Sequence, residues 1–365
     1  MAKLLECDVL VIGAGPAGSR AAMRAASEGL EVVLVDSKTR LGERPHCGEF
    51  VPYQIFSEFS LNRGSIVHKI NNLETLLVEN RLESRFKSNL IQSSGFIVDR
   101  PKFDRYMAIE AAISGALTMS STTFSAFTDK GCIVKSSRDE FLVEAKFIIA
   151  ADGARSSVRK KLGLLTADCV EGRQFETIIS NTCSSNAMVF LDQEFFCGYG
   201  WLFPKGTTGN IGVGLLPKDG LASSESLENF REMLLKMGLI KPGWIARTSG
   251  FIPAFGIRFP VIVDNILFVG DAAGLAHPIT GAGIAPAVYS GDVAGDLVAK
   301  AVKSGNSSIV SKYQDVILYR YGGSYKHALS KRRIQLESWE SKDFAELCNR
   351  TWISFKGYKK RERQF

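Results

Sequence analysis

Three glycines near the N-terminus, Gly13, Gly15 and Gly18, restrict the fold more than any other feature of the chain. The run before them, residues 7–12, is mostly apolar and β-branched, as in a buried strand of a parallel sheet. The alanine-rich run after them predicts a helix over residues 17–28, and residues 31–35 predict a second strand. This order is a βαβ unit, so the chain should open with a parallel sheet covered by helices.

The spacing Gly-x-Gly-x-x-Gly gives each glycine a role. Gly13 permits a tight turn, Gly15 lets a pyrophosphate approach the backbone, and Gly18 lets the helix pack closely on the strand. Ala14 lies in the same turn, where the helix N-terminus offers free N–H groups to phosphates. Asp36 follows the second strand and is placed to accept hydrogen bonds from a ribose. The whole unit predicts dinucleotide binding, whereas the glycine string alone is also typical of an ordinary turn.

Two further turns carry an aspartate directly after a predicted buried strand. Asp152 begins an Asp-Gly-Ala-Arg segment, and Asp271 follows Gly270. A carboxylate at a strand end can accept from ribityl or ribose hydroxyls. The helix that begins near Gly283 and Ile284 can aim its dipole at negative charge on a ring. Each turn alone is also typical of a capped strand-to-helix connection.

Together and in this order, the three motifs resemble those of FAD-dependent oxidoreductases of the aromatic-hydroxylase type. The resemblance covers residues 8–302 and implies FAD as the cofactor. It also implies a mixed α/β fold, in which a Rossmann-like FAD-binding domain carries an inserted antiparallel-sheet substrate domain and C-terminal helices.

Two stretches narrow the resemblance to the geranylgeranyl reductases. Pro45-His-Cys47-Gly48-Glu49 resembles their P-x-x-C-G motif, although only one residue separates the proline from the cysteine here. In that motif the cysteine faces the flavin. The segment Tyr199-Gly-Trp201-Leu-Phe203-Pro, followed by Gly212-Val-Gly214, is similar to their lipid-pocket motif Y-x-W-x-F-P…G-x-G. The resemblance assigns substrate contacts to Tyr199, Trp201 and Phe203. It assigns cofactor contacts to Ala17, Cys47, Gly48, Arg100, Phe124, Asp271, Gly283 and Ile284.

Several of these residues also have simpler interpretations. Three aromatic side chains at alternating positions of one strand are typical of an ordinary core. Cys47 is either an inert buried thiol, a proton donor or a redox-active group. His46 and Glu49 are its neighbours. His277 either approaches the flavin or has a structural role.

The chain departs from the geranylgeranyl reductases at two places. Phe50 stands where that family commonly has glycine, which changes the space near the flavin ring. The C-terminal region is shorter than in many members, which leaves open how a lipid tunnel would close.

The pattern of apolar and polar residues along the chain also predicts the domain organisation. Residues 37–97 predict irregular loops and short strands, residues 119–143 an antiparallel meander, and residues 147–151 a separate strand of the parallel sheet. An antiparallel sheet with one helix is expected between about 165 and 255. The expected division is an FAD-binding domain of residues 1–165 and 255–305, a substrate domain of 166–254 to which 50–95 contribute in part, and a helical region of 306–365.

The predicted reaction is the reduction of isolated C=C bonds in geranylgeranyl-type chains by hydride from reduced FAD, with Cys47 as a catalytic candidate. Two alternatives are an FAD-dependent monooxygenase acting on a small hydrophobic molecule and a non-catalytic electron-transfer or lipid-binding flavoprotein. Because no second dinucleotide fingerprint is present, NADPH would bind transiently, or ferredoxin or another carrier would supply the electrons. Nothing in the sequence forms a metal site or a Ser/His/Asp set.

The net charge of +7 is concentrated near the C-terminus. Lys331, Arg332 and Arg333 form one cluster, and the tail holds Lys356, Lys359, Lys360, Arg361 and Arg363. These cations predict either a solvated terminus or contact with anionic lipid headgroups, and no nucleic-acid-binding signature accompanies them. The seven cysteines show no C-x-x-C pair, and the early first strand leaves no room for a signal peptide. A cytoplasmic protein is therefore expected, and peripheral membrane contact is a further hypothesis.

Overall fold

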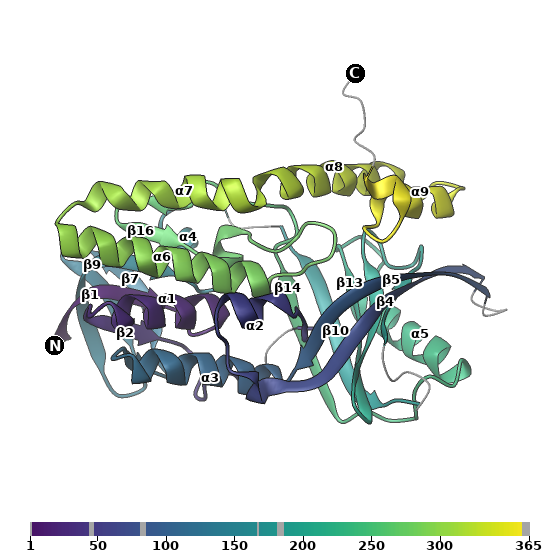
Figure 1. Cartoon of the computed structure of the whole chain (residues 1–365), viewed down its shortest axis with the longest axis horizontal. Helices are drawn as coiled ribbons and strands as arrows, with labels where there is room; N and C mark the ends of the chain where they lie inside the picture. Colours follow the sequence, from purple (N-terminus) through teal and green to yellow (C-terminus); the bar gives the residue numbers. More distant parts are fainter. Residues whose placement is uncertain (1, 44–46, 81–84, 166–167, 181–185, 360–365) are drawn as a thin grey trace, which may run out of the picture.

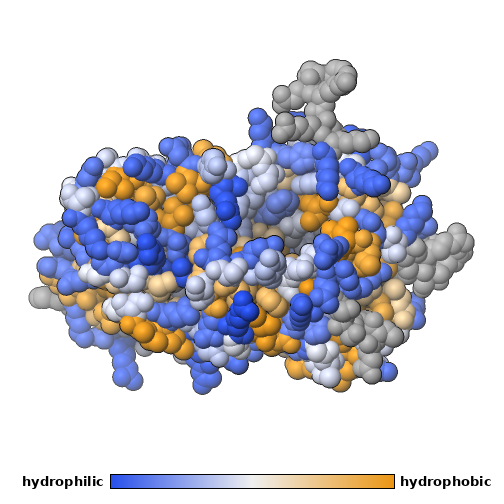
Figure 2. Space-filling view, in the orientation of Figure 1, coloured by the Kyte–Doolittle hydropathy of each residue, from blue (hydrophilic) through white to orange (hydrophobic). Residues whose placement is uncertain are grey.

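We describe the protein from a computed structural model, which describes residues 2–43, 47–80, 85–165, 168–180 and 186–359. Two sheets lie side by side along the long axis of the molecule, and helices run along the top of both (Figure 1). On the face shown in Figure 2, hydrophilic residues predominate and apolar residues form separate patches. No helix in these ranges is both long and apolar enough to span a membrane.

The first sheet is largely parallel and contains the predicted βαβ unit. Its strands, in spatial order, are β15 (Ile262–Val263), β16 (Ile266–Phe268), β9 (Glu140–Ala150), β1 (Lys3–Ile12), β2 (Val32–Val35) and β6 (Leu117–Met119). The centre of β1 is fully buried, because both faces of a parallel sheet are covered in such folds. The continuous apolar run at residues 9–12 reflects this burial.

Strand β9 differs from the prediction of a separate strand at residues 147–151. It is one strand of 11 residues whose first part pairs with β8 (Gly131–Lys135) and whose whole length pairs with β1. Strand β7 (Thr123–Thr128) pairs with β8, so the predicted meander is present. Polar residues in the first half of β9 hid its length, because only the second half is fully buried.

Helices α1 (Pro16–Ser27), α3 (Arg100–Ile113) and α6 (Ile284–Ser304) lie together against the first sheet (Figure 1). Helix α6 approaches α1 through two glycines. A Cβ atom at Gly291 would lie 2.1 Å from the Ala17 carbonyl oxygen, and one at Gly295 would lie 2.5 Å from that of Ala21. The two helices therefore contact each other backbone to backbone, and both begin at the same edge of the sheet.

The second sheet is antiparallel except where β11 pairs with β4. Its strands, in spatial order, are β14 (Ala246–Ile252), β10 (Val170–Ile178), β13 (Thr208–Leu215), β12 (Tyr199–Lys205), β11 (Asn186–Leu191), β4 (Ile66–Asn80), β5 (Arg85–Val98) and β3 (Phe50–Pro52). Helix α5 (Ser223–Lys236) packs on one face through a cluster that includes Phe175, Phe190 and Phe230.

The prediction of irregular loops and short strands over residues 37–97 agrees with the three-residue strand β3 but is wrong from Ile66 onward. Strands β4 and β5 have 15 and 14 residues and form a long hairpin of the second sheet. Register shifts interrupt their pairing near His68, Asn72 and Asn80. Polar residues and these irregularities break the period-2 pattern, so the length of the hairpin was not readable from the sequence.

The C-terminal region is helical, as predicted. Helix α7 (Lys312–Ile317) continues through a π turn (Leu318–Gly322) into α8 (Gly323–Ser338), and α9 (Phe344–Thr351) follows. Lys331 and Arg332 on α8 are buried, so the predicted surface cluster is wrong for these two residues, and only Arg333 is exposed. Of the predicted basic tail, Lys356 and Lys359 lie in a short 3-10 helix, and Lys360, Arg361 and Arg363 lie outside the described residues.

The remaining described helical elements are short. They are α2 (Gln54–Glu58), α4 (Ser157–Lys161) and the 3-10 turns at Arg63–Ser65, Gly270–Ala273, Ser307–Ser311 and Lys356–Lys359.

Candidate functional site

A cavity of about 690 Å³ lies between the two sheets and takes lining residues from both. Most of the residues singled out from the sequence line it: Gly13, Gly15, Ala17, Asp36, Cys47, Gly48, Arg100, Phe124, Asp152, Tyr199, Trp201, Phe203, Asp271, Gly283 and Ile284. Three do not, namely Ala14, Gly18 and Gly270. Two of them allow close packing behind the turns: a Cβ at Gly18 would lie 1.8 Å from the Gly13 carbonyl oxygen, and one at Gly270 would lie 2.9 Å from Ala17 Cβ.

The glycine turn after β1 forms one end of the cavity. Gly13 has a φ of +104°, and a Cβ there would lie 2.4 Å from the Ala151 carbonyl oxygen, so only glycine fits. A Cβ at Gly15, in contrast, would meet no atom within 4 Å. Gly15 is also the N-cap of α1 and provides no side-chain cap. The backbone is thus open on this side, and the N–H groups of α1 remain available to an anion.

Asp36 closes the same end of the cavity. Its Oδ2 accepts a hydrogen bond from the Ala14 N–H at 2.7 Å, and its Oδ1 accepts one from the Lys38 N–H at 2.8 Å. These bonds fix the carboxylate at the end of β2, where ribose hydroxyls can donate to its remaining lone pairs.

Asp152 has one satisfied and one unsatisfied oxygen. Its Oδ2 accepts from Ser157 Oγ at 2.9 Å and from the Val158 N–H at 3.0 Å, which anchors the start of α4. Its Oδ1 is buried and has no hydrogen-bond partner in the described part of the chain. A buried acceptor without a donor is costly, so a ligand with hydroxyl groups suits this wall.

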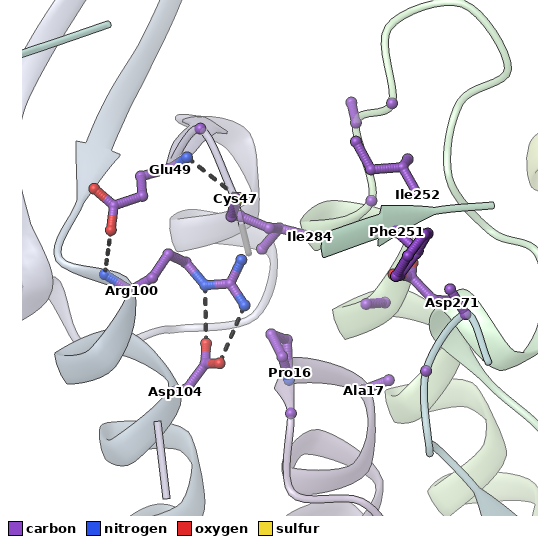
Figure 3. A pocket seen from close by; sticks show the side chains of 18 of the residues that line it. Pro16, Ala17, Cys47, Glu49, Arg100, Asp104, Phe251, Ile252, Asp271 and Ile284 are labelled. Carbon is purple, nitrogen blue, oxygen red and sulfur yellow. Dashed lines mark hydrogen bonds and ion pairs between the residues drawn. The ribbon is translucent and has the colours of Figure 1, made fainter. Parts of the chain in front are cut away.

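Asp271 and the start of α6 face the middle of the cavity (Figure 3). Burial raises the pKa of Asp271 to about 6, although the positive charge of Arg100 opposes the shift. A Cβ at Gly283 would lie 3.1 Å from Asp271 Oδ1, so the glycine lets this carboxyl approach the N-terminus of the helix.

His277 is a structural residue of the turn before α6. Its Nδ1 accepts from the N–H groups of Ile279 and Thr280, both at 3.3 Å, and its ring packs edge-on against Tyr325. Burial lowers the pKa of His277 to about 4, so the ring is neutral at physiological pH. His277 does not line the cavity, and of its two interpretations the structural one agrees with this geometry.

Cys47 lies on the cavity wall beside Arg100 and Ile284 (Figure 3). The Glu49 N–H donates to its sulfur at 3.2 Å. Burial raises the pKa of the Cys47 thiol, and the nearby Arg100 guanidinium opposes this only in part. Arg100 itself is held by Asp104 through two hydrogen bonds of 3.0 and 3.1 Å. The thiol therefore carries its proton at neutral pH. His46 lies outside the described residues.

Strand β12 contributes an aromatic wall to the cavity. Tyr199, Trp201 and Phe203 share one face, with neighbouring ring centroids 5.9 and 6.4 Å apart. Tyr199 donates its hydroxyl proton to the Thr280 carbonyl at 2.5 Å, which joins the wall to the turn before α6. The Gly-x-Gly part of the motif lies opposite on β13, where Trp201 pairs with Gly212. A Cβ at Gly212 would lie 2.2 Å from Trp201 Cζ2, so the glycine makes room for the indole.

Sequence reasoning missed several lining residues. Phe251 and Ile252 come from β14, which was not predicted, and Trp352 and Ile353 come from the segment after α9. The missed set also includes Leu73 on β4 and Ser93 on β5. Glu49, Phe50 and Arg155 also line the cavity, although no ligand contact was assigned to them from the sequence. All three carried a signal, because Glu49 and Phe50 directly follow Cys47-Gly48 and Arg155 belongs to the Asp-Gly-Ala-Arg segment. The Arg155 guanidinium lies 3.4 Å from the centroid of the Phe251 ring.

Phe50 stands where the geranylgeranyl reductases commonly have glycine. Its ring fits because the neighbouring strand β5 has a glycine, Gly95, beside it. A Cβ at Gly95 would lie 2.5 Å from the Phe50 ring. The Phe50 ring also lies 6.2 Å from that of Phe203, so it extends the aromatic wall.

These features fit FAD. The open backbone at Gly15, the carboxylate of Asp36 and the unsatisfied oxygen of Asp152 suit phosphates, ribose and ribityl hydroxyls, and the apolar walls suit a flat ring. The sequence profile of a family described as an FAD binding domain matches residues 6–185. Fold and site together define an FAD-dependent oxidoreductase.

Comparison with known proteins shows to which family of FAD-dependent oxidoreductases the chain belongs. The chain is 30% identical to digeranylgeranylglycerophospholipid reductase 3 of Methanosphaera stadtmanae, over 91% of this chain and 88% of the relative. It is 31% identical to digeranylgeranylglycerophospholipid reductase of Methanocaldococcus jannaschii, over 81% and 78%. The structure of a geranylgeranyl bacteriochlorophyll reductase-like protein from Thermoplasma acidophilum superposes with a TM-score of 0.86 at 25% identity, covering 97% of this chain and 92% of that one. The chain belongs to the geranylgeranyl reductase family of FAD-dependent oxidoreductases.

Proposed function

We propose that this protein saturates isolated C=C bonds in the isoprenoid chains of geranylgeranyl-type lipids. The observation that carries the proposal is one continuous cavity, which joins the dinucleotide turn at Gly13 and Gly15 to the aromatic wall at Tyr199, Trp201 and Phe203. A hydrocarbon chain on that wall would lie within the same enclosed space as the cofactor. The relatives named digeranylgeranylglycerophospholipid reductases support this substrate class and argue against the monooxygenase alternative.

In this proposal, residues of the chain bind the cofactor, orient the isoprenoid chain and protonate an alkene carbon. Reduced FAD, when bound, supplies the hydride that reaches one alkene carbon. Gly13, Gly15 and Asp36 would hold its ADP half, and Asp152 and Asp271 would accept from hydroxyls of the other half. Tyr199, Trp201 and Phe203 would orient the chain and keep water away from it. The second alkene carbon needs a proton, and the Cys47 thiol, protonated and on the cavity wall, is placed to supply it from Sγ.

The reaction needs an electron donor as well as a hydrophobic substrate. The chain carries one dinucleotide fingerprint, which the cofactor would occupy. We therefore expect NADPH to bind only transiently, or ferredoxin or another carrier to deliver the electrons.

The test is an anaerobic reduction assay. The purified yellow protein is reduced with dithionite, geranylgeranyl diphosphate or an unsaturated archaeal-type ether lipid is added, and products are weighed by mass spectrometry. We expect a mass gain of two or its multiples. Oxygen uptake on adding NADPH in air, with no mass gain in the anaerobic assay, would instead support a monooxygenase. A flavin that cycles but converts neither substrate would support the non-catalytic alternative.

Peripheral membrane contact is a separate part of the proposal and rests on the basic tail. Lys356 and Lys359 lie near the C-terminal end of the described chain, and three further cations follow in the sequence. Each cation near an anionic surface contributes about 1 kcal/mol. Replacing Lys360, Arg361 and Arg363 by glutamine should weaken co-sedimentation with anionic vesicles, whereas exchange of exposed Lys312, Lys326 and Arg333 should not. Equal binding by the tail variant would contradict the proposal.

A further inference from the structure

Glu49 combines two features that are unfavourable for a glutamate. Its backbone has a φ of +70°, in the left-handed region that glycine adopts easily and other residues seldom adopt. Its side chain is also buried, at 5% exposure. A buried carboxylate without partners is strongly disfavoured, so its surroundings must compensate for both features.

Three donors from three elements surround the carboxylate. Lys205 Nζ, at the end of β12, lies 2.8 Å from Oε2, and Asn210 Nδ2 on β13 donates to the same oxygen at 2.6 Å. The Arg100 N–H, at the start of α3, donates to Oε1 at 3.4 Å (Figure 3). The side chain is thus fixed to the second sheet on one side and to a helix of the first sheet on the other.

A further acid holds Lys205 in place. Glu176 Oε2 lies 3.4 Å from Lys205 Nζ, and Glu176 Oε1 accepts from Thr208 Oγ1 at 2.6 Å. The Lys205 side chain is itself largely buried, at 13% exposure. The cation therefore has little freedom to leave Glu49.

The Glu49 backbone connects the fixed side chain to the Cys47 thiol. Its N–H donates to Cys47 Sγ at 3.2 Å, and its carbonyl accepts from the Val98 N–H at 3.0 Å. The intervening Gly48 lies directly on the aromatic wall, since a Cβ there would lie 2.8 Å from the Phe203 ring. Any release of the Glu49 side chain would therefore let the turn, and the thiol with it, move away from that wall.

We propose that Glu49 is a positioning residue that holds Cys47 at the cavity wall, and that Lys205 and Asn210 fix Glu49 for this role. The catalytic meaning of the position rests on the proposed function. The clamp itself is a property of the fold and is measured without any substrate.

The experiment measures the alkylation rate of Cys47 in the FAD-loaded protein with iodoacetamide, resolved by peptide mass spectrometry. Half-buried Cys169 serves as the internal reference in the same sample. In Glu49→Gln and Lys205→Met the turn should open more often, so Cys47 labelling should rise about fivefold or more relative to Cys169. Glu49→Gly removes the clamp but suits the left-handed backbone, so it should label faster without losing stability through strain.

The matched control is Glu194→Gln, because Glu194 also accepts from an asparagine side chain at 2.6 Å, that of Asn229. Cys47 labelling in this variant should equal that of the unaltered protein. If Lys205→Met does not fold, the nearly isosteric Glu49→Gln carries the test.

Unchanged Cys47 labelling in Glu49→Gln and Glu49→Gly, with a lower melting temperature in the former, would overturn the proposal and leave the clamp a purely structural contact. Failure of the unaltered protein to reduce an alkene would contradict the proposed function without affecting this result. The two failures are thus distinguishable.

Discussion

At the scale of single residues, the proposed role of Cys47 as a proton donor depends on the pKa of its thiol. Two influences on its pKa oppose each other: burial disfavours the thiolate, and the Arg100 guanidinium favours it. Burial is the stronger influence, so the pKa of the Cys47 thiol is raised above its ordinary value. A protonated thiol that lies beside a fixed cation can release its proton, because the cation stabilises the resulting thiolate.

We predict that Cys47→Ala lowers the rate of alkene reduction by about 100-fold or more, the usual contribution of a general acid. FAD binding should change little, because in the proposed function the glycine turn and Asp36 would hold the ADP half. The measurements are single-turnover reduction and flavin titration. Cys169→Ala is the control, since Cys169 is half-buried but does not line the cavity. Full activity in Cys47→Ala would exclude the thiol as the proton donor.

A second prediction at the scale of single residues concerns Asp271 and the pH dependence of protein stability. Burial raises its pKa from the ordinary 3.8 to about 6. Below pH 4 the carboxyl is protonated in both folded and unfolded chains and costs nothing. Between about pH 4 and 6 the folded protein keeps a proton that the unfolded chain has lost, so stability falls as the pH rises through this window.

Asp271→Asn should therefore stabilise the FAD-free protein at pH 7 by on the order of 3 kcal/mol and leave it unchanged near pH 4. Its affinity for FAD should fall at the same time, because a carboxylate on the cavity wall is lost. Urea unfolding at both pH values measures the first effect. Asp219→Asn removes the same charge from an exposed turn and should have neither effect. A pH-independent gain would show that another property of the amide is responsible.

At the scale of elements, strands β12 and β13 form one unit in which Gly212 and Gly214 of β13 make room for the Trp201 ring of β12. The sequence motif already contained this pairing, because Trp201 and Gly212 are both part of it. The motif could not predict the strands that lie beyond β11, which form the long β4–β5 hairpin.

The βαβ opening was predictable because burial on both faces of the sheet produces continuous apolar runs. The hairpin mixes polar residues with register shifts, so its local pattern carries little information.

Gly212 and Gly214, two of the three glycines of β13, provide a matched pair of variants. A Cβ at Gly212 would lie 2.2 Å from the Trp201 ring, whereas one at Gly214 would lie 3.4 Å from it. We predict that Gly212→Ala displaces the indole, costs about 1–3 kcal/mol of stability and raises KM for the lipid. Gly214→Ala should remain close to the unaltered protein. Tryptophan fluorescence, urea unfolding and steady-state kinetics compare them, and equal behaviour of the two variants would argue against this packing.

At the scale of the whole molecule, the cavity depends on parts of the chain that are far apart in sequence. Arg332 on α8 donates to the carbonyl oxygens of Pro278 and Cys197 and so links the turn before α6 to the start of β12. The segment after α9 crosses the β4–β5 hairpin, where Asn89 Nδ2 donates to the Ser354 carbonyl at 2.7 Å. No local pattern marks residues such as Trp352, because their role arises only when the C-terminal region folds back on the second sheet.

Substitution of Trp352 tests whether the C-terminal region, packed on the second sheet, forms part of the substrate cavity. Its ring lies 5.0 Å from that of Tyr199, its Nε1 donates to Thr75 Oγ1 at 3.2 Å, and it lines the cavity. Trp339 is similarly buried and donates to the Gln193 carbonyl at 2.8 Å, but it does not line the cavity. Phenylalanine at either position loses one hydrogen bond and leaves a small void, so each variant should be destabilised by about 1–3 kcal/mol.

Only Trp352→Phe should alter catalysis, because only this indole forms part of the cavity wall. We expect its KM for the lipid to rise about tenfold, equivalent to about 1.4 kcal/mol of binding free energy. FAD affinity should be unchanged in both variants, since the first sheet supplies the glycine turn and Asp36. Thermal unfolding, flavin titration and steady-state kinetics separate these effects. A similar rise in KM for Trp339→Phe would mean that general loosening of the C-terminal region, rather than the cavity wall at Trp352, controls substrate binding.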